Sequence, residues 1–378
     1  MRTLAPLVLA LVLAACSDSA KKENIEPPTP LADFESRASI ERLWSSSLGD
    51  GAASTGANLA PAFAGGRVFA AGLDAGLVAF DASNGKRLWS QEIEGLTGGP
   101  GASLTIVVVG SIEGDVYAFD PETGESRWQA RVSSEVISAP AIDDNLVVVV
   151  ANDGRTHALD ARDGKQLWAV DRGVPALSLR GNSVPIISGD RVIVASANGK
   201  ITSLARDDGR VLWEQVVGVA EGRTDLERMI DVDGRIAVQR GDVFVAGYES
   251  TAQALTSDGG RTLWTRELSS VAGLAAGDDA VFVVATNGEL WALDRRTGGS
   301  LWKIDILAHR MLSAPALIGD YVVVGDLEGY LHVVERSSGE LVARTQVGDA
   351  GFGDGLIVAD GVLYAQNKDG ALGAFRIQ

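Results

Sequence analysis

Tryptophan recurs along this chain at a regular interval, and this spacing constrains the fold more than any other feature. Neighbouring members of the series lie 38 to 51 residues apart. The series consists of Trp44, Trp89, Trp128, Trp168, Trp213, Trp264 and Trp302. An eighth position, 41 residues after the last, is occupied by Ala343. A repeat of about 40 residues built only from strand-like segments is typical of a β-propeller.

Each repeat contains the same motif, in which a Gly precedes an apolar run, an Asp, a turn with a second Gly, and then the Trp. Residues 114–128 show it in full. The turn residues between the two strands favour a hairpin, with Gly at positions that need a positive φ. Two further strands precede each motif, one short and one β-branched, as at 139–141 and 147–150. Four strands make one blade. Eight such units predict an all-β protein, an eight-bladed propeller with four antiparallel strands per blade.

The two ends of the repeat region are each incomplete. The eighth unit reaches Phe375 and then ends at Gln378, without an outer strand. Residues 40–44 read as an outer strand with no blade before it. Pairing of this N-terminal strand with the last blade closes the ring and covers two sheet edges. We therefore expect one propeller domain over residues 40–378.

The periodic tryptophans are expected to be structural. A large ring on an outer strand can be buried against the adjacent blade, and its indole N–H can bind the backbone there. A cofactor cage would not need one Trp in every blade.

The first residues are typical of a bacterial targeting segment. Arg2 precedes a short apolar run, which is shorter than the roughly 20 residues that a helix needs to span a bilayer. Leu13-Ala14-Ala15-Cys16 resembles a lipobox, so we expect a signal peptide over 1–15 and a lipidated Cys16, the only cysteine of the chain. The alternative is an ordinary secretory signal with an incidental cysteine. The polar, proline-containing stretch 16–39 is expected to be a disordered tether, and Ser17 after the cysteine favours the outer membrane.

Composition and motifs give little sign of catalysis. A formal net charge of −17 argues against binding to nucleic acid. The three histidines, His157, His309 and His332, show no metal-ligand spacing. Residues 231–234 resemble the start of a calcium loop, but Arg235 and Ile236 stand where a ligand and a Gly are required. No catalytic residue, metal or cofactor is expected, and the protein is predicted not to be an enzyme.

Three Trp intervals are long, at 45, 45 and 51 residues, but the extra residues of the first, at 49–57, are small and polar and look like loop filler. The other two long repeats carry apolar and charged residues. The extra residues lie around 176–181 and 227–233, each between an outer strand and the next inner strand. Because consecutive strands alternate in direction, both loops should emerge at the same end of the propeller, on adjacent blades. Insertions in repeat proteins often form the binding face, and an apolar centre with Arg suits an interface. Alternatively, Arg180 pairs with Asp231 or Asp233 and merely stabilises the loops.

The lipobox, the tether, the eight units and the Trp motif together resemble the BamB family of outer-membrane assembly lipoproteins, over nearly the whole chain. The Trp motif alone is shared with quinoprotein dehydrogenases. The resemblance implies a scaffold in the Bam complex, lipid-anchored (palmitate) at the outer membrane and facing the periplasm. It also implies binding to the POTRA domains of BamA, contacts with other Bam subunits, and help to unfolded outer-membrane proteins.

The same resemblance implies that the partner-binding residues lie in the two long loops. They are Leu177, Leu179, Arg180, Asp231 and Asp233. Two other functions remain open: a periplasmic dehydrogenase that uses pyrroloquinoline quinone, and a scaffold lipoprotein of another envelope complex.

Overall fold

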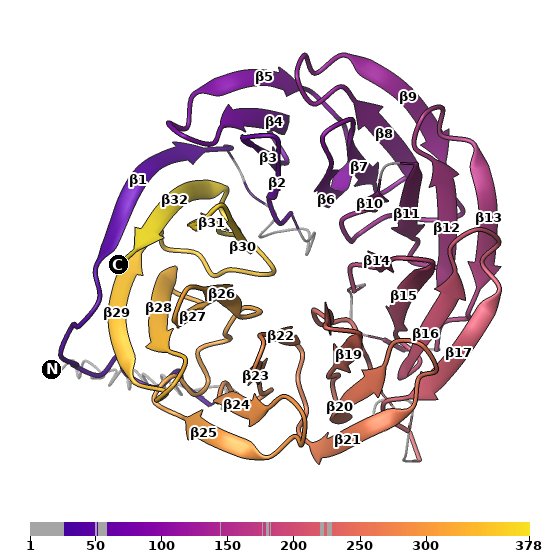
Figure 1. Cartoon of the computed structure of the whole chain (residues 1–378). Coiled ribbons are helices and arrows are strands. Elements are labelled where there is room, and N and C mark those ends of the chain that lie inside the picture. The colour runs from indigo at the N-terminus through magenta and orange to yellow at the C-terminus, as the bar shows by residue number, and fades with distance from the viewer. Residues whose placement is uncertain are drawn as a thin grey trace, which may run out of the picture.

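The chain folds into a ring of eight four-stranded sheets, shown in Figure 1. This computed structural model describes residues 26–49, 51, 59–143, 145–175, 177–178, 181, 183–219, 223–224 and 229–378. The regular structure in these residues is all β-strand, and every pair of neighbouring strands within a sheet is antiparallel. A helix able to cross a membrane is not found in this part of the chain. The predicted eight-bladed propeller is confirmed.

Blades 1 to 4 follow one another along the chain, each with its first strand at the centre of the ring. Blade 1 holds β2 (Ala62–Ala64), β3 (Arg67–Gly72), β4 (Gly76–Asp81) and β5 (Arg87–Gln91). Blade 2 holds β6 (Leu96–Ala102), β7 (Val107–Ser111), β8 (Asp115–Phe119) and β9 (Ser126–Arg131). Blade 3 holds β10 (Ala141–Asp143), β11 (Leu146–Val150), β12 (Arg155–Asp160) and β13 (Gln166–Asp171). Blade 4 holds β14 (Ile186–Ser188), β15 (Arg191–Ser196), β16 (Lys200–Ala205) and β17 (Val211–Val216).

Blades 5 to 7 repeat this order, and blade 8 takes its outer strand from the N-terminus. Blade 5 holds β18 (Ala237–Gln239), β19 (Asp242–Val245), β20 (Thr251–Thr256) and β21 (Thr262–Glu267). Blade 6 holds β22 (Leu274–Ala276), β23 (Ala280–Val284), β24 (Leu290–Asp294) and β25 (Ser300–Ile304). Blade 7 holds β26 (Ala316–Ile318), β27 (Tyr321–Gly325), β28 (Tyr330–Glu335) and β29 (Leu341–Gln346). Blade 8 holds β30 (Leu356–Ala359), β31 (Val362–Gln366), β32 (Ala371–Ile377) and β1 (Ile40–Ser47).

The ring closes by pairing the N-terminal strand with the last strand, as the sequence predicts. The antiparallel register of β1 and β32 runs from Ile40 opposite Ile377 to Ser47 opposite Ala371. Just beyond this ladder, Ser39 and Gln378 exchange two backbone hydrogen bonds of 2.8 and 3.1 Å. The first and last strands of the domain are therefore neighbours, and Figure 1 shows β1 lying outside β32.

Every periodic tryptophan links its blade to the next one. Each indole N–H donates to a backbone carbonyl of the following blade at 2.8–3.2 Å. Each ring also lies against the second Gly of the next motif, where a Cβ would come within 2.6–2.8 Å of the ring carbons. These glycines are Gly85, Gly124, Gly164, Gly209, Gly260, Gly298 and Gly339, all with φ between +66° and +77°. Trp and Gly recur together because the missing side chain of the Gly leaves the space that the Trp ring of the preceding blade fills.

The junction between blades 7 and 8 differs, which accounts for Ala343. Blade 8 has no turn between its third and fourth strands, because its fourth strand comes from the other end of the chain. Residues 36–39 occupy this place, where the amides of Arg37 and Ala38 both donate to the carbonyl of Val342. Ala343 and Ala38 are buried in the same apolar cluster. A small side chain at 343 therefore leaves room for the incoming segment.

Two ends of the ring can be distinguished by their connections. We call the end that carries the links between blades the loop face; it also holds the turns between the second and third strands. The opposite end, which holds the other turns, is the turn face. The long links 172–185 and 217–236 both belong to the loop face, on adjacent blades, as expected from the alternation of strand direction.

Candidate functional site

The two long links touch each other and form one surface. Ser183 Oγ donates a hydrogen bond of 3.0 Å to the carbonyl of Gly234. A Cβ placed on Gly181 would lie 2.8 Å from a carboxylate oxygen of Asp233. Two insertions more than 50 residues apart in the sequence are thus packed together over the junction of blades 4 and 5.

The second link is built firmly into the ring below this surface. Tyr248, in the turn between β19 and β20, exchanges backbone hydrogen bonds with Asp231, of which Tyr248 N to Asp231 O is 2.7 Å. Gly247 lies so close to this segment that a Cβ would meet the Asp231 carbonyl at 2.3 Å. Val232 is fully buried in the core between blades 4 and 5. Residues 231 and 232 are therefore anchored to blades 4 and 5 below the loop surface.

The residues expected to bind a partner divide into two groups. Leu177 is 42% exposed at the loop face, whereas Asp231 is only 1% exposed and Asp233 is half-buried. Leu179 and Arg180, like Cys16, lie outside the described residues. The two aspartates thus lie beneath the surface that Leu177 reaches, and their side chains suit support of the loops better than a broad contact.

Asp233 has an unfavourable environment for its charge. Burial raises the pKa of this carboxyl well above its usual range, and the neighbouring carboxylate of Asp231 raises it further. A carboxyl group that is partly removed from water and lies beside another carboxylate resists ionisation, because burial and a neighbouring like charge both destabilise its charged form. Perturbed acids of this kind concentrate at functional sites.

The substitution Asp233→Asn is expected to stabilise the protein at neutral pH. The folded-state pKa is raised, so the free energy of unfolding falls as the pH rises above about 3.9, the unfolded value. Asn removes this penalty, and we expect a gain of about 1–3 kcal/mol at pH 7.5 that shrinks toward zero at pH 4. Urea unfolding at both pH values measures it.

A matched control is the exposed Asp163, whose pKa is lowered by Lys165. Asp163→Asn should bring no gain at pH 7.5. Equal destabilisation by Asp233→Asn at both pH values would contradict the electrostatic explanation.

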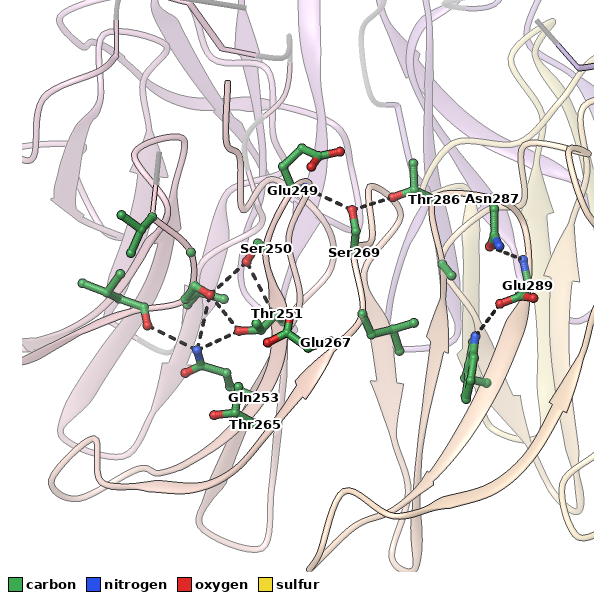
Figure 2. Close-up of a pocket in the computed structure, with 17 residues that line it drawn as sticks. Glu249, Ser250, Thr251, Gln253, Thr265, Glu267, Ser269, Thr286, Asn287 and Glu289 are labelled. Carbon is green, nitrogen blue, oxygen red and sulfur yellow. Dashed lines mark hydrogen bonds between the residues drawn. The ribbon is translucent and has the colours of Figure 1, made fainter. Parts of the chain in front are cut away.

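A polar groove continues from these loops along the loop face, over blades 5 and 6 (Figure 2). It has a volume of about 900 Å³ and begins at the end of β17, beside Val219. Glu249 and Glu267 line it and form no ion pair within the described part of the chain, whereas Glu289 is paired with Lys303 at 2.7 Å. The groove therefore offers negative charge next to the exposed valine.

Sequence reasoning missed this groove, although one signal was present. The unit that forms blade 5 has Ser250 where the other motifs begin with Gly. The positive φ moves one residue earlier, to Glu249 at +48°, and the Glu249 amide donates to Ser269 Oγ at 3.0 Å. Ser250 and Thr251 both donate to the carbonyl of Val217. The irregular motif thus reshapes the turn that faces the groove.

The centre of the ring is crossed by Arg235. Its guanidinium donates to the carbonyls of Pro315, Asp354 and Leu356, at 2.9–3.4 Å, and so reaches blades 7 and 8. The segment that resembles the start of a calcium loop therefore has a structural role, because Arg235 links it to blades 7 and 8 on the opposite side of the ring. In the residues that the structure describes, no three His, Cys, Asp or Glu side chains come together as a metal site.

His157 and His332 lie at equivalent positions in the third strands of blades 3 and 7. His157 pairs with Val149 across β11 and β12, and its ring nitrogens lie 2.9 Å from Ser133 Oγ and from Gln166 Oε1. His332 pairs with Val324 in the same way. Both rings are buried within their blades.

The fold and the site define a repeat propeller whose distinctive surface is a pair of interacting loops at one end. Comparison with known proteins gives its family. The family model for outer membrane protein assembly factor BamB matches residues 36–100, 85–304 and 295–378. The outer membrane protein assembly factor BamB of Xanthomonas campestris pv. campestris is 39% identical over 98% of this chain and 96% of its own length. The chain belongs to the BamB family.

Solved structures agree with this assignment. The crystal structure of BamB from Moraxella catarrhalis has a TM-score of 0.82 and 28% identity, and covers 89% of this chain and 100% of that one. A quinohemoprotein alcohol dehydrogenase from Comamonas testosteroni has a TM-score of 0.71 at 12% identity, covering 89% of this chain and 76% of that one. The second likeness is one of fold alone.

Proposed function

We propose that the protein is a non-enzymatic scaffold of the outer-membrane β-barrel assembly machinery, which binds the POTRA domains of BamA through its two long links. The observation that carries this proposal is the contact between the links, through Ser183 and Gly234, in a member of the BamB family. It joins the exposed Leu177 and the Asp231–Asp233 segment into one surface. Leu177, Leu179 and Arg180 supply the contacts, and Asp231 and Asp233 shape the second link.

The proposal includes the position of the protein in the cell. Cys16 carries the lipid, residues 1–15 are the signal peptide, and the propeller faces the periplasm at the outer membrane. The relatives are named as assembly factors, which supports a scaffold rather than a catalyst. Unfolded outer-membrane proteins are a second class of partner, which would pair with the exposed edges of outer strands such as β13 and β21.

Simultaneous substitution of Leu177, Leu179 and Arg180 by Ala tests the binding site. Apolar and Arg side chains at the centre of an interface each contribute about 1–2 kcal/mol or more, so we expect co-purification with BamA from detergent-solubilised envelopes to fall at least tenfold. The matched control replaces Leu167 and Leu301 by Ala, because these leucines are 52% and 55% exposed on outer strands. Full binding by the triple variant would refute the site.

A further inference from the structure

The N-terminal segment before the propeller is held in place by a network of charged groups. Residues 26–39 were expected to be the end of a disordered tether, yet they run along blade 7 from the loop face to the turn face. Thr29 contacts the link between β25 and β26, Ala32 contacts β29, and Arg37 meets the start of β29. We call residues 26–39 the strap.

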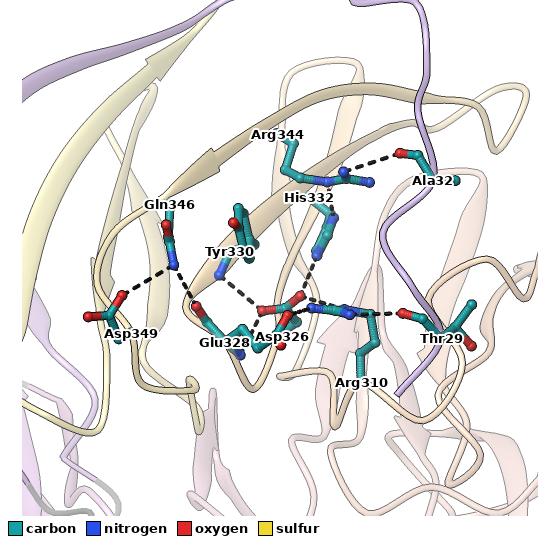
Figure 3. A network of polar contacts seen from close by, with 10 residues as sticks. All are labelled: Thr29, Ala32, Arg310, Asp326, Glu328, Tyr330, His332, Arg344, Gln346 and Asp349. Atoms are coloured by element: carbon teal, nitrogen blue, oxygen red, sulfur yellow. Dashed lines mark hydrogen bonds and ion pairs between the residues drawn. The ribbon is translucent and has the colours of Figure 1, made fainter. Parts of the chain in front are cut away.

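Two arginines hold the strap by its backbone, as Figure 3 shows. Arg310 Nη1 donates to the carbonyl of Thr29 at 2.8 Å, and the Thr29 amide donates to Ala308 at 3.1 Å. Arg344 Nη1 donates to the carbonyl of Ala32 at 3.2 Å. The Arg344 guanidinium also lies 5.0 Å from the ring centroid of Phe34, which packs against the core between blades 6 and 7. We call Arg310 and Arg344 the clasp.

The clasp is held rigid from inside the ring. Arg310 is 2% exposed and donates to Asp326 Oδ2 at 2.7 Å and to Glu328. His332 Nε2 lies 2.8 Å from the same Asp326 oxygen, and Arg344 Nε donates to His332 Nδ1. Because Nδ1 accepts this bond, the proton of the neutral ring is on Nε2 and is donated to Asp326. Both arginines are thus aimed at the strap by one buried Asp–His pair.

Backbone strain marks the same place. His309 and Met311, on either side of Arg310, have φ values of +58° and +47°. Left-handed conformations are unfavourable for such residues and persist only where the surrounding contacts fix them. Here they turn Arg310 inward and leave Met311 72% exposed.

Exposed apolar side chains are concentrated at the end of the ring where the strap begins. Fourteen large apolar side chains are exposed in the described residues; six lie on outer strands. Of the others, seven lie on the loop face and only Leu104 lies on the turn face. The seven are Ile112, Val174, Leu177, Val219, Val271, Ile306 and Met311. The loop face therefore carries most of the exposed apolar side chains outside the outer strands, and Ile306 and Met311 adjoin the clasp.

We propose that the clasp fixes the point at which the N-terminus leaves the ring, so that the lipid at Cys16 holds the loop face of blades 6 and 7 at the bilayer surface. This rests on the lipidation in the proposed function. Cys16 and Glu26 are ten residues apart, and ten residues span at most about 35 Å. As a flexible coil these ten residues span roughly 16–19 Å, no more than the separation of the two ends of the ring, so the end at which the strap begins is kept next to the bilayer. The partner of this surface is therefore phospholipid.

Fluorescence quenching in vesicles tests the orientation. The lipidated full chain, carrying Met311→Cys or Leu104→Cys, is labelled at its one free thiol and reconstituted into phosphatidylethanolamine–phosphatidylglycerol vesicles with a headgroup quencher. The positions are equally exposed, at 72% and 76%, on opposite ends of the ring. Six-residue strands separate the ends by about 20 Å. We expect the label at 311 to be quenched at least threefold more than the label at 104.

A second variant shows whether the strap is the cause. Replacement of residues 29–34 by a Gly-Ser sequence of the same length leaves the buried Asp326–His332 pair in place, and the quenching ratio should fall toward one. Equal quenching at both positions, or a ratio that the replacement does not change, would overturn the proposal while leaving binding to BamA untouched. If the chain does not float with the vesicles, lipidation and the orientation fail together.

Discussion

Deletion of residues 40–47 is expected to abolish the cooperative unfolding transition of the propeller. The deletion exposes the edge of β32 and removes Trp44, which is 7% exposed and lies between blades 8 and 1. The Trp44 ring contacts Phe80 and Tyr364, and its N–H donates to Ala82 at 2.9 Å. Loss of a buried aromatic residue alone costs about 3–5 kcal/mol, and the unpaired strand edge adds to this. Circular dichroism during heating measures the transition.

A circularly rearranged chain tests whether the propeller needs the strand itself or needs it at the N-terminus. Ser39 and Gln378 exchange two backbone bonds, so a two-residue Asn-Gly turn can join them as a hairpin. A chain that begins at residue 48 and continues from Gln378 through Asn-Gly into residues 39–47 should recover a cooperative transition. If the simple deletion melts like the intact protein, ring closure is not required for stability.

Gly260→Ala is expected to destabilise the protein by about 2–5 kcal/mol, from two sources that add. Gly260 has a φ of +66°, which disfavours any side chain, and a Cβ would lie 2.6 Å from the ring of Trp213. The ring cannot move away, because its N–H is bonded to Ser257 of the same turn at 2.9 Å. Urea unfolding should show a lower midpoint with an unchanged slope.

The control for this substitution is Gly241→Ala. Gly241 has a φ of +83°, but no atom lies within 4 Å of its Cβ position. Gly241→Ala should therefore lower the free energy of unfolding by only about 1–2 kcal/mol, the cost of a side chain at positive φ. Replacement of Trp213 by Ala should reduce the cost of Gly260→Ala, because the clash is removed. Equal effects at Gly260 and Gly241 would show that the Trp ring does not require the glycine.

The repetitive part of the fold could be predicted because each blade repeats the same local sequence motif. The Trp and Gly spacing indicates the number of blades, and the isolated strand at 40–44 indicates the closure. The position of the two long links, at the same end of the ring and on adjacent blades, also follows from strand direction. The burial of Asp231 could not be predicted, because it depends on Gly247 and Tyr248 from another turn. The strap was missed for a similar reason: its partners, Arg310 and Arg344, are 281 and 312 residues from the residues that they bind.

The strap also determines how the ring responds to force. Tension applied at the N-terminus reaches the contact between Glu26 and His309 first, and then breaks the bonds of Thr29 and Ala32 to the clasp one after another. Only then does it load the two amides on Val342, and last the β1–β32 ladder. The strap thus protects ring closure from tension, because its contacts must break before β1, the strand that closes the propeller, is pulled. The junction between blades 7 and 8, which has no tryptophan, is also the one that the strap protects from tension.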